Sequence, residues 1–274
     1  MDRIRDALRQ LGGLQSVASF SLLYYNFLAE RLADEDAGDR TLRRSFAELV
    51  EWEVRYHTAL GNLTDADGVS IIGIGDLADK RHAGLCEVVA RLSRMSGLSG
   101  RREATRQLIV AECFYQTVMY ERVVSCLEAA IEAGARDPLV FFSLGYNRYV
   151  VAEQVFAATD ASTGDHVVVD ARGYRRALLE AVTAFEDGLS GGELDAQLYW
   201  WIGTCLERAG FANAARKAFR EAEQGAEEQA LEPTEQTDGS QEPFGEEDAE
   251  LEMVRRALRR PCRASDIIGD GRPC

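Results

Sequence analysis

The chain has 274 residues, of which 46% are hydrophobic, so it is long enough and apolar enough to bury a sizeable core. Its formal net charge of −15 at pH 7 disfavours binding to nucleic acid and to anionic membranes, because both are bound through lysine and arginine. Six cysteines without a C-x-x-C pair and only three histidines predict neither a metal site nor a disulfide framework. No apolar run is long enough to span a membrane and no signal-peptide pattern is present, so we expect a cytoplasmic protein.

Residues 1–100 predict an irregular helical region. The first stretch, "MDRIRDALRQL", is amphipathic and stops at Gly12 and Gly13. The next, "LQSVASFSLLYYNFLAERLA", is apolar nearly all round, which is typical of a helix that is buried or that faces a partner. Residues 40–63 and 77–97 carry apolar side chains close to helical spacing, and we interpret residues 64–76 between them as a break.

Two short motifs lie in or beside this break. The stretch "GIGDLA", residues 73–78, matches the glycine spacing of dinucleotide-binding sites, but no β-α-β unit surrounds it. The stretch "DADG", residues 65–68, lacks the remaining ligands of a calcium loop. We therefore expect a plain loop here and no cofactor.

From residue 101 the pattern becomes a regular series of helix pairs. The first helices include "VFFSLGYNRY" and "LYWWIGTCLE", and their partner helices carry the spacing A-x3-F in "AVTAFEDG" and "AARKAFRE". This resembles the tetratricopeptide repeat, a helix-turn-helix of 34 residues with the consensus W-x2-L-G-x2-Y…A-x3-F. The resemblance covers residues 104–224. It implies an all-α, tetratricopeptide-like solenoid over residues 101–224.

The spacing of small residues places an insertion in the middle repeat. Ala111 and Gly145 are one period of 34 residues apart, whereas the interval from Gly145 to Gly203 exceeds one period by about 24 residues. The partner helix of this repeat keeps its phase through Ala181 and Phe185. The extra residues therefore lie between its two helices, at about 151–173, where the sequence predicts a longer first helix and then a loop or short hairpin.

In tetratricopeptide arrays the first helix of each repeat lines a concave groove. The resemblance implies that this groove is mostly aromatic or apolar here and holds no basic residue, which disfavours the family's carboxylate clamp for C-terminal peptides. The expected partner-binding residues are Leu108, Tyr115, Phe142, Tyr146, Tyr149, Gln197, Trp200 and Trp201. The alternative is that a helix from the first hundred residues covers this face.

Residues 225–274 differ in composition from the rest. The stretch from about Gln224 to Glu250 has no basic residue and little to bury, so we expect an acidic, disordered linker. The following stretch, "LEMVRRALRR", reverses the charge. It is either a frayed end or a docking peptide for a partner or for the protein's own groove.

The sequence contains no recognisable catalytic constellation. His57, His82 and His166 lie on separate segments and outside any motif, so we expect no catalytic residue and no enzyme. We expect a non-enzymatic scaffold or adaptor that binds a protein or peptide segment, and self-association into a homo-oligomer is left open. The alternative is a peptide-responsive regulator whose N-terminal helices form an effector or DNA-binding head.

Overall fold

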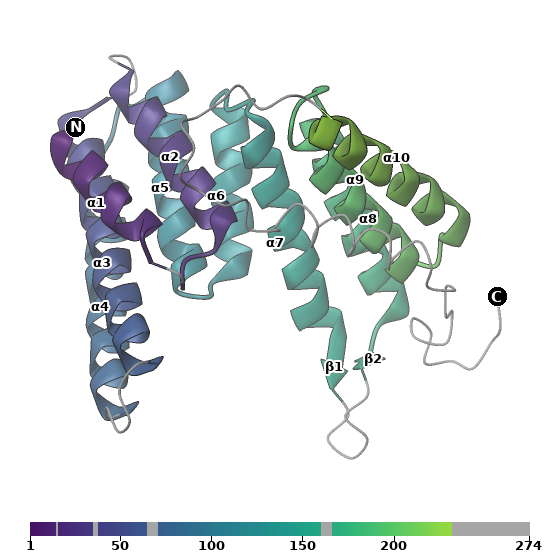
Figure 1. The fold of residues 1–274 in the computed structure, drawn as a ribbon, viewed down its shortest axis with the longest axis horizontal. Coiled ribbons are helices and arrows are strands. Elements are labelled where there is room, and N and C mark those ends of the chain that lie inside the picture. Colours follow the sequence, from purple (N-terminus) through teal and green to yellow (C-terminus); the bar gives the residue numbers. More distant parts are fainter. Residues whose placement is uncertain (15, 35–37, 65–70, 160–165, 232–274) are drawn as a thin grey trace. The chain divides into compact units, whose positions relative to one another are not determined.

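The computed structural model describes residues 1–14, 16–34, 38–64, 71–159 and 166–231 (Figure 1). Within these ranges the chain forms ten α-helices in antiparallel pairs and one two-stranded sheet. The predicted all-α class is therefore confirmed. Among the same residues, no helix combines the length and the apolar character that crossing a membrane requires.

The chain divides into two compact units, Met1–Ala135 and the residues from Arg136 onward. The first unit consists of α1 (Asp2–Gly12), α2 (Ser19–Ala33), α3 (Arg40–Thr64), α4 (Ile71–Ser93), α5 (Gly100–Gln116) and α6 (Tyr120–Glu132). Helices α3 and α4 form one pair and α5 and α6 another, while α2, α3 and α4 all contact α5. The pair α5–α6, which the repeat pattern groups with the later helices, thus belongs to the first unit.

Apolar spacing explains how the N-terminal helices pack. In α1 the buried residues Ile4, Ala7 and Leu11 recur at helical spacing, so one stripe faces α3. In α2 the buried face includes Tyr25, which is 1% exposed. Leu23 on the opposite side of α2 is 44% exposed, so this helix is buried on one face only.

The second unit consists of α7 (Pro138–Phe156), β1 (Ala157–Thr159), β2 (His166–Val168), α8 (Ala171–Gly188), α9 (Asp195–Arg208) and α10 (Ala212–Leu231). Asp137 caps α7 by accepting a hydrogen bond from the Leu139 amide at 3.0 Å. Strands β1 and β2 pair antiparallel, and Figure 1 shows them at the end of α7. The insertion between the helices of this pair therefore includes a short hairpin, as the sequence predicts.

The two helix pairs of the second unit share one packing feature. A Cβ atom on Gly145 of α7 would lie 2.6 Å from the ring of Phe185 on α8. A Cβ atom on Gly203 of α9 would lie 2.6 Å from the ring of Phe219 on α10. No real Cβ approaches so closely, so glycine at both positions allows a phenylalanine of the partner helix to pack against the helix backbone.

Two expectations about helix ends are wrong. Residues 71–76, expected in a loop, form the start of α4, because two glycines lower helix propensity by only about 1 kcal/mol each and a long helix tolerates them. Residues 224–231, expected to be disordered, form the end of α10, where alanine, glutamate and glutamine favour helix. The rest of the expected linker and the C-terminal segment, residues 232–274, lie outside the described residues.

Val118 lies two residues after the end of α5, a position that is occupied by glycine after α6 and after α9. It has a positive φ of 61°, its amide donates to the Tyr115 carbonyl, and the Met119 amide donates to the Phe114 carbonyl. Gly134 and Gly210 lie two residues after the ends of α6 and α9 and have the same pair of hydrogen bonds and a positive φ. A β-branched residue is strained in this backbone conformation.

Val118→Gly is therefore expected to raise the free energy of unfolding by about 1 kcal/mol. The side chain is 63% exposed, so its removal loses little apolar burial. Urea unfolding followed by circular dichroism measures the change, with Gly134→Val as the reverse substitution that should destabilise. A less stable Val118→Gly variant would mean that the valine side chain makes a stabilising contact that outweighs its strain.

Candidate functional site

Five aromatic side chains of the second unit form one cluster, which we call the aromatic cluster: Tyr146 and Tyr149 of α7, Phe185 of α8, and Trp200 and Trp201 of α9. Trp201 is its centre, with ring-centroid distances of 5.1 Å to Tyr146, 5.3 Å to Tyr149 and 4.8 Å to Trp200. It also stacks on Phe185 at 6.2 Å. Phe185 is buried and the other four are half-buried, so part of the cluster is open to solvent.

The adjacent tryptophans have different environments within this cluster. The Trp201 ring contacts aromatic rings from both α7 and α8, so it anchors α9 to its neighbours. The Trp200 indole meets the Trp201 ring edge-on, and its N–H is buried without a hydrogen-bond acceptor among the described residues. An unpaired buried donor costs about 1–3 kcal/mol, so Trp200 contributes less to the fold than its size suggests.

A charged group borders the cluster beside Tyr149. Arg208 donates a hydrogen bond to Glu153 at 2.6 Å, and its guanidinium lies 5.4 Å from the centroid of the Tyr149 ring. Tyr174 also donates its hydroxyl hydrogen to Glu153. Burial raises the pKa of Tyr149 further above its ordinary value. The aromatic surface thus already accommodates one guanidinium.

The other predicted site residues differ in their placement. Phe142 is 6% exposed and packs edge-on against Phe185, so it supports the aromatic cluster from the core. Gln197 is half-buried on α9. Tyr115 is half-buried on α5 and packs edge-on against Tyr120. Leu108 is fully buried in the first unit, because α2, α3 and α4 pack against α5, and it offers no surface to a partner.

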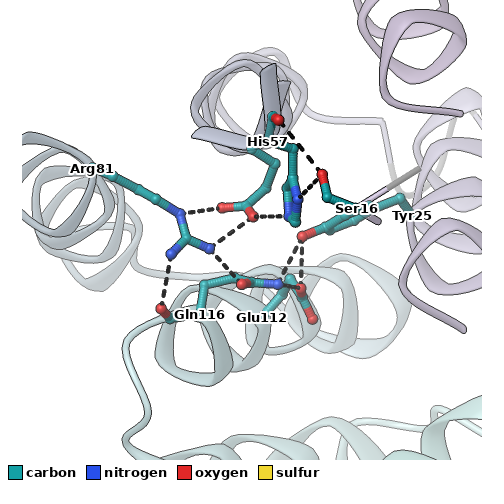
Figure 2. A network of polar contacts seen from close by, with 7 residues as sticks. Ser16, Tyr25, His57, Arg81, Glu112 and Gln116 are labelled. Carbon is teal, nitrogen blue, oxygen red and sulfur yellow. Dashed lines mark hydrogen bonds and ion pairs between the residues drawn. The ribbon is translucent and has the colours of Figure 1, made fainter. Parts of the chain in front are cut away.

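A second constellation, in the first unit, has no counterpart in the sequence predictions. Figure 2 shows side chains from four helices and the segment before α2 joined by hydrogen bonds and ion pairs. We call these the polar network: Ser16, Tyr25, Glu53, His57, Arg81, Glu112 and Gln116. Glu53 and Glu112 stand at helical spacing from Val50 and Leu108, where an apolar residue would continue the core stripe. This interruption is the only sequence signal of the network that we identify.

Arg81 holds three helices of the network together. Its guanidinium donates to both carboxylate oxygens of Glu53 on α3, each at 2.7 Å. It also donates to the side-chain and main-chain oxygens of Gln116 on α5. The side chains of Arg81 and Glu53 are only 12% and 2% exposed, so this is a buried bidentate ion pair.

Glu112 is the most strongly perturbed carboxyl group of the network. One of its oxygens accepts hydrogen bonds from the Tyr25 hydroxyl and the Gln116 amide, both at 2.8 Å. Burial raises the pKa of Glu112 to about 7, although these hydrogen bonds favour the charged form. Burial raises the pKa of Glu53 as well, and the Arg81 guanidinium opposes that shift.

Ser16, His57 and Glu53 follow the order of a nucleophile, a base and an acid. The Ser16 hydroxyl lies 2.9 Å from Nδ1 of His57, and Nε2 of His57 lies 3.7 Å from Glu53. A catalytic acid stabilises the imidazolium of its histidine, but here Arg81 neutralises Glu53. Burial and the Arg81 charge lower the pKa of His57. These charges favour a structural role for the network over acid–base catalysis.

No protein-family model, curated protein or solved structure matches this chain. The resemblance to the tetratricopeptide repeat therefore depends on the residues of the chain alone. Among the described residues, no group of three or more histidine, cysteine, aspartate or glutamate side chains could hold a metal ion. The aromatic cluster is the candidate site that combines several large apolar side chains with partial exposure.

Proposed function

We propose that this chain is a protein-binding module of the helical-repeat type, which binds an apolar or amphipathic protein segment on the aromatic cluster. The single observation that carries the proposal is the half-buried group of Tyr146, Tyr149, Trp200 and Trp201. Aromatic residues are the commonest anchors of protein interfaces, because they bury a large area at a low cost in conformational entropy.

The repeat architecture in this proposal is supported by the shared packing of the two helix pairs. Phe185 and Phe219, which pack against Gly145 and Gly203, are 34 residues apart, the period of the tetratricopeptide repeat. In such a scaffold α7 and α9 are the first helices of successive repeats. Their side chains would then form the binding surface of the module.

The Trp200 indole also supports a binding role. Its N–H has no acceptor among the described residues, so no hydrogen bond holds the ring in its observed orientation. A bound segment could supply a main-chain carbonyl as the acceptor once the ring turns outward. Such a hydrogen bond would be gained only in the complex.

Peptide selection with the full chain as bait tests this function. We expect the selected peptides to share apolar or aromatic anchors, and the double variant Tyr146→Ala, Trp200→Ala to weaken their binding at least tenfold, about 1.4 kcal/mol. Fluorescence anisotropy with a labelled selected peptide measures the Kd. These two positions are chosen because Trp201 also stabilises the fold.

The matched control is Phe211→Ala, which removes a 42% exposed aromatic side chain of the same unit outside the cluster. It should leave the Kd unchanged. Circular dichroism and urea unfolding check that both variants remain folded. A double variant that is folded and binds the selected peptides as tightly as the parent chain would refute the proposed site.

A further inference from the structure

We infer that the segment bound by the aromatic cluster carries an arginine, whose guanidinium stacks on the exposed indole surface of Trp200. This inference rests on the proposed function, because it names the chemistry of the partner at the same surface. Three features of the second unit favour arginine. They are the kind of surface that Trp200 exposes, the contacts between the rings of the cluster, and the charges of α7 and α9.

The part of Trp200 that a partner can contact is ring carbon. Trp200 is half-buried, and the N–H of its indole is the buried end. In the observed orientation its exposed side-chain surface therefore consists of carbon atoms. The face of an aromatic ring is electrostatically negative, and among side chains tryptophan attracts cations most strongly. Arginine is the cation found most often in such contacts.

The second unit already places guanidinium groups on aromatic rings at two positions. Arg208 lies 5.4 Å from the centroid of the Tyr149 ring, at the border of the cluster. Arg175 lies 6.0 Å from the centroid of Phe211, a ring that is 42% exposed. Within the described part of the chain no cation lies over Trp200. A partner can therefore supply at Trp200 the kind of contact that the chain itself makes at Tyr149.

The contacts between the rings favour a planar cation. The Trp201 centroid lies 4.8 Å from that of Trp200 and 5.1 Å from that of Tyr146, with interplanar angles of 89° and 80°. Rings at these distances are in edge-to-face contact, so Trp201 fills the space between its neighbours. A methylated ammonium binds inside a cage of rings, which requires that space to be open. A guanidinium is flat and stacks on a ring from outside.

The charges of the unit favour a cationic partner over an acidic one. Helices α7 and α9 carry two arginines, and both are engaged within the unit. Arg148 donates to the main-chain oxygen of Glu180 at 2.9 Å, and Arg208 donates to Glu153 at 2.6 Å. Residues 136–159 and 166–231 together carry 13 acidic and 9 basic side chains. An arginine is therefore attracted to this unit, whereas an acidic segment is repelled.

The probes are four fluorescein-labelled synthetic peptides that share leucines at helical spacing. They differ only at two positions between the leucines, which carry arginine, lysine, citrulline or glutamate. Citrulline has the shape of arginine without its charge, so the comparison isolates the guanidinium. Fluorescence anisotropy with the full chain measures the four Kd values. We expect the arginine peptide to bind about tenfold more tightly than the citrulline peptide, with lysine between them and glutamate weakest.

Substitution of the ring separates stacking from general attraction by the acidic unit. Trp200→Leu keeps an apolar side chain but removes the aromatic face, so the preference for arginine over citrulline should fall below about twofold. Trp200→Phe keeps an aromatic face and should retain most of the preference. The control variant Phe211→Leu removes an exposed ring outside the cluster and should leave all four Kd values unchanged. Circular dichroism checks that each variant is folded.

Nuclear magnetic resonance of the parent chain gives a second readout that needs no stabilising substitution. Titration with the arginine peptide should shift the indole N–H resonance of Trp200 and leave that of Trp52 on α3 in place. The Trp200→Phe spectrum assigns the resonance. A Trp200 resonance that does not move while the arginine peptide binds would overturn the inference.

The outcomes separate this inference from the proposed function. Suppose that the arginine peptide fails to bind, or binds no more tightly than the citrulline peptide, while selected peptides still depend on Tyr146 and Trp200. That result would overturn the inference and leave the function standing. A preference for arginine that survives Trp200→Leu would place the guanidinium elsewhere and also overturn it. If the selected peptides do not depend on the aromatic cluster, the proposed function fails and the inference fails with it.

Discussion

Arg81→Ala is expected to lower the free energy of unfolding by about 3–5 kcal/mol, because it leaves the buried carboxylate of Glu53 without a counter-ion. The same substitution removes the hydrogen bonds that join α4 to Gln116 of α5. Removing one partner of a buried ion pair leaves the other charge buried and unpaired. This costs far more free energy than replacing both partners by apolar residues. Urea unfolding at neutral pH, followed by circular dichroism, measures the change.

The adjacent residue provides a matched control for this prediction. Lys80 pairs with Asp76 on the surface of the same helix, with side chains 63% and 65% exposed. Lys80→Ala should therefore change stability by no more than about 0.5 kcal/mol. The double variant Glu53→Leu, Arg81→Leu should lower the free energy of unfolding by less than Arg81→Ala does, because it leaves no unpaired buried charge. Equal effects of Arg81→Ala and Lys80→Ala would show that the buried pair does not stabilise the first unit.

Glu112→Gln is expected to change how stability depends on pH. The pKa of Glu112 is about 7 in the folded chain and 4.5 for an ordinary glutamate, so the folded state binds the proton more tightly. The contribution of protonated Glu112 to the free energy of unfolding is fully present below pH 4.5. It falls by roughly 3 kcal/mol in all as the pH rises through 7. A neutral glutamine avoids this loss, so the variant should match the parent near pH 5 and exceed its stability near pH 8.

The charged and polar groups around Glu112 remain in both chains. They are Tyr25 on α2, Glu53 on α3, Arg81 on α4 and Gln116 on α5. The lowered pKa of His57 acts in the opposite direction, since the stability it contributes is lost as the pH falls. The difference between the two stability curves from pH 5 to pH 8 therefore isolates Glu112. Parallel curves would contradict the raised pKa and mean that Glu112 is already ionised at pH 5.

The all-α class and most helix positions could be predicted from local sequence. Apolar side chains at helical spacing identify the buried face of α1 and of the α9–α10 pair without any knowledge of their neighbours. The pairing of Gly203 with Phe219 follows the same logic, because a small residue where two helices cross makes room for a ring. The ends of the helices are harder to predict, because only small differences in helix propensity decide whether residues 71–76 and 224–231 are helical.

The sequence predicts Tyr146, Tyr149, Trp200 and Trp201 among the eight residues that line one groove, and the structure brings these four side chains together. The environment of each ring was decided by tertiary structure. Trp201 is held among rings from two other helices, while the Trp200 N–H has no acceptor among the described residues. Leu108 has the same helical spacing as an exposed groove residue, but helices from elsewhere in the chain bury it.

The sequence by itself determined the local properties of this protein, because helix propensity and apolar spacing involve residues a few positions apart. Only the tertiary structure decided the polar network. In the sequence Arg81 looks like an ordinary surface charge on a helix, and Glu53 and Glu112 only interrupt apolar stripes without indicating a partner. They become a buried, hydrogen-bonded group because packing of α2, α3, α4 and α5 removes water from all of them together. The raised pKa of Glu112 is a property of that packing, since it depends on partners up to 87 residues away in the chain.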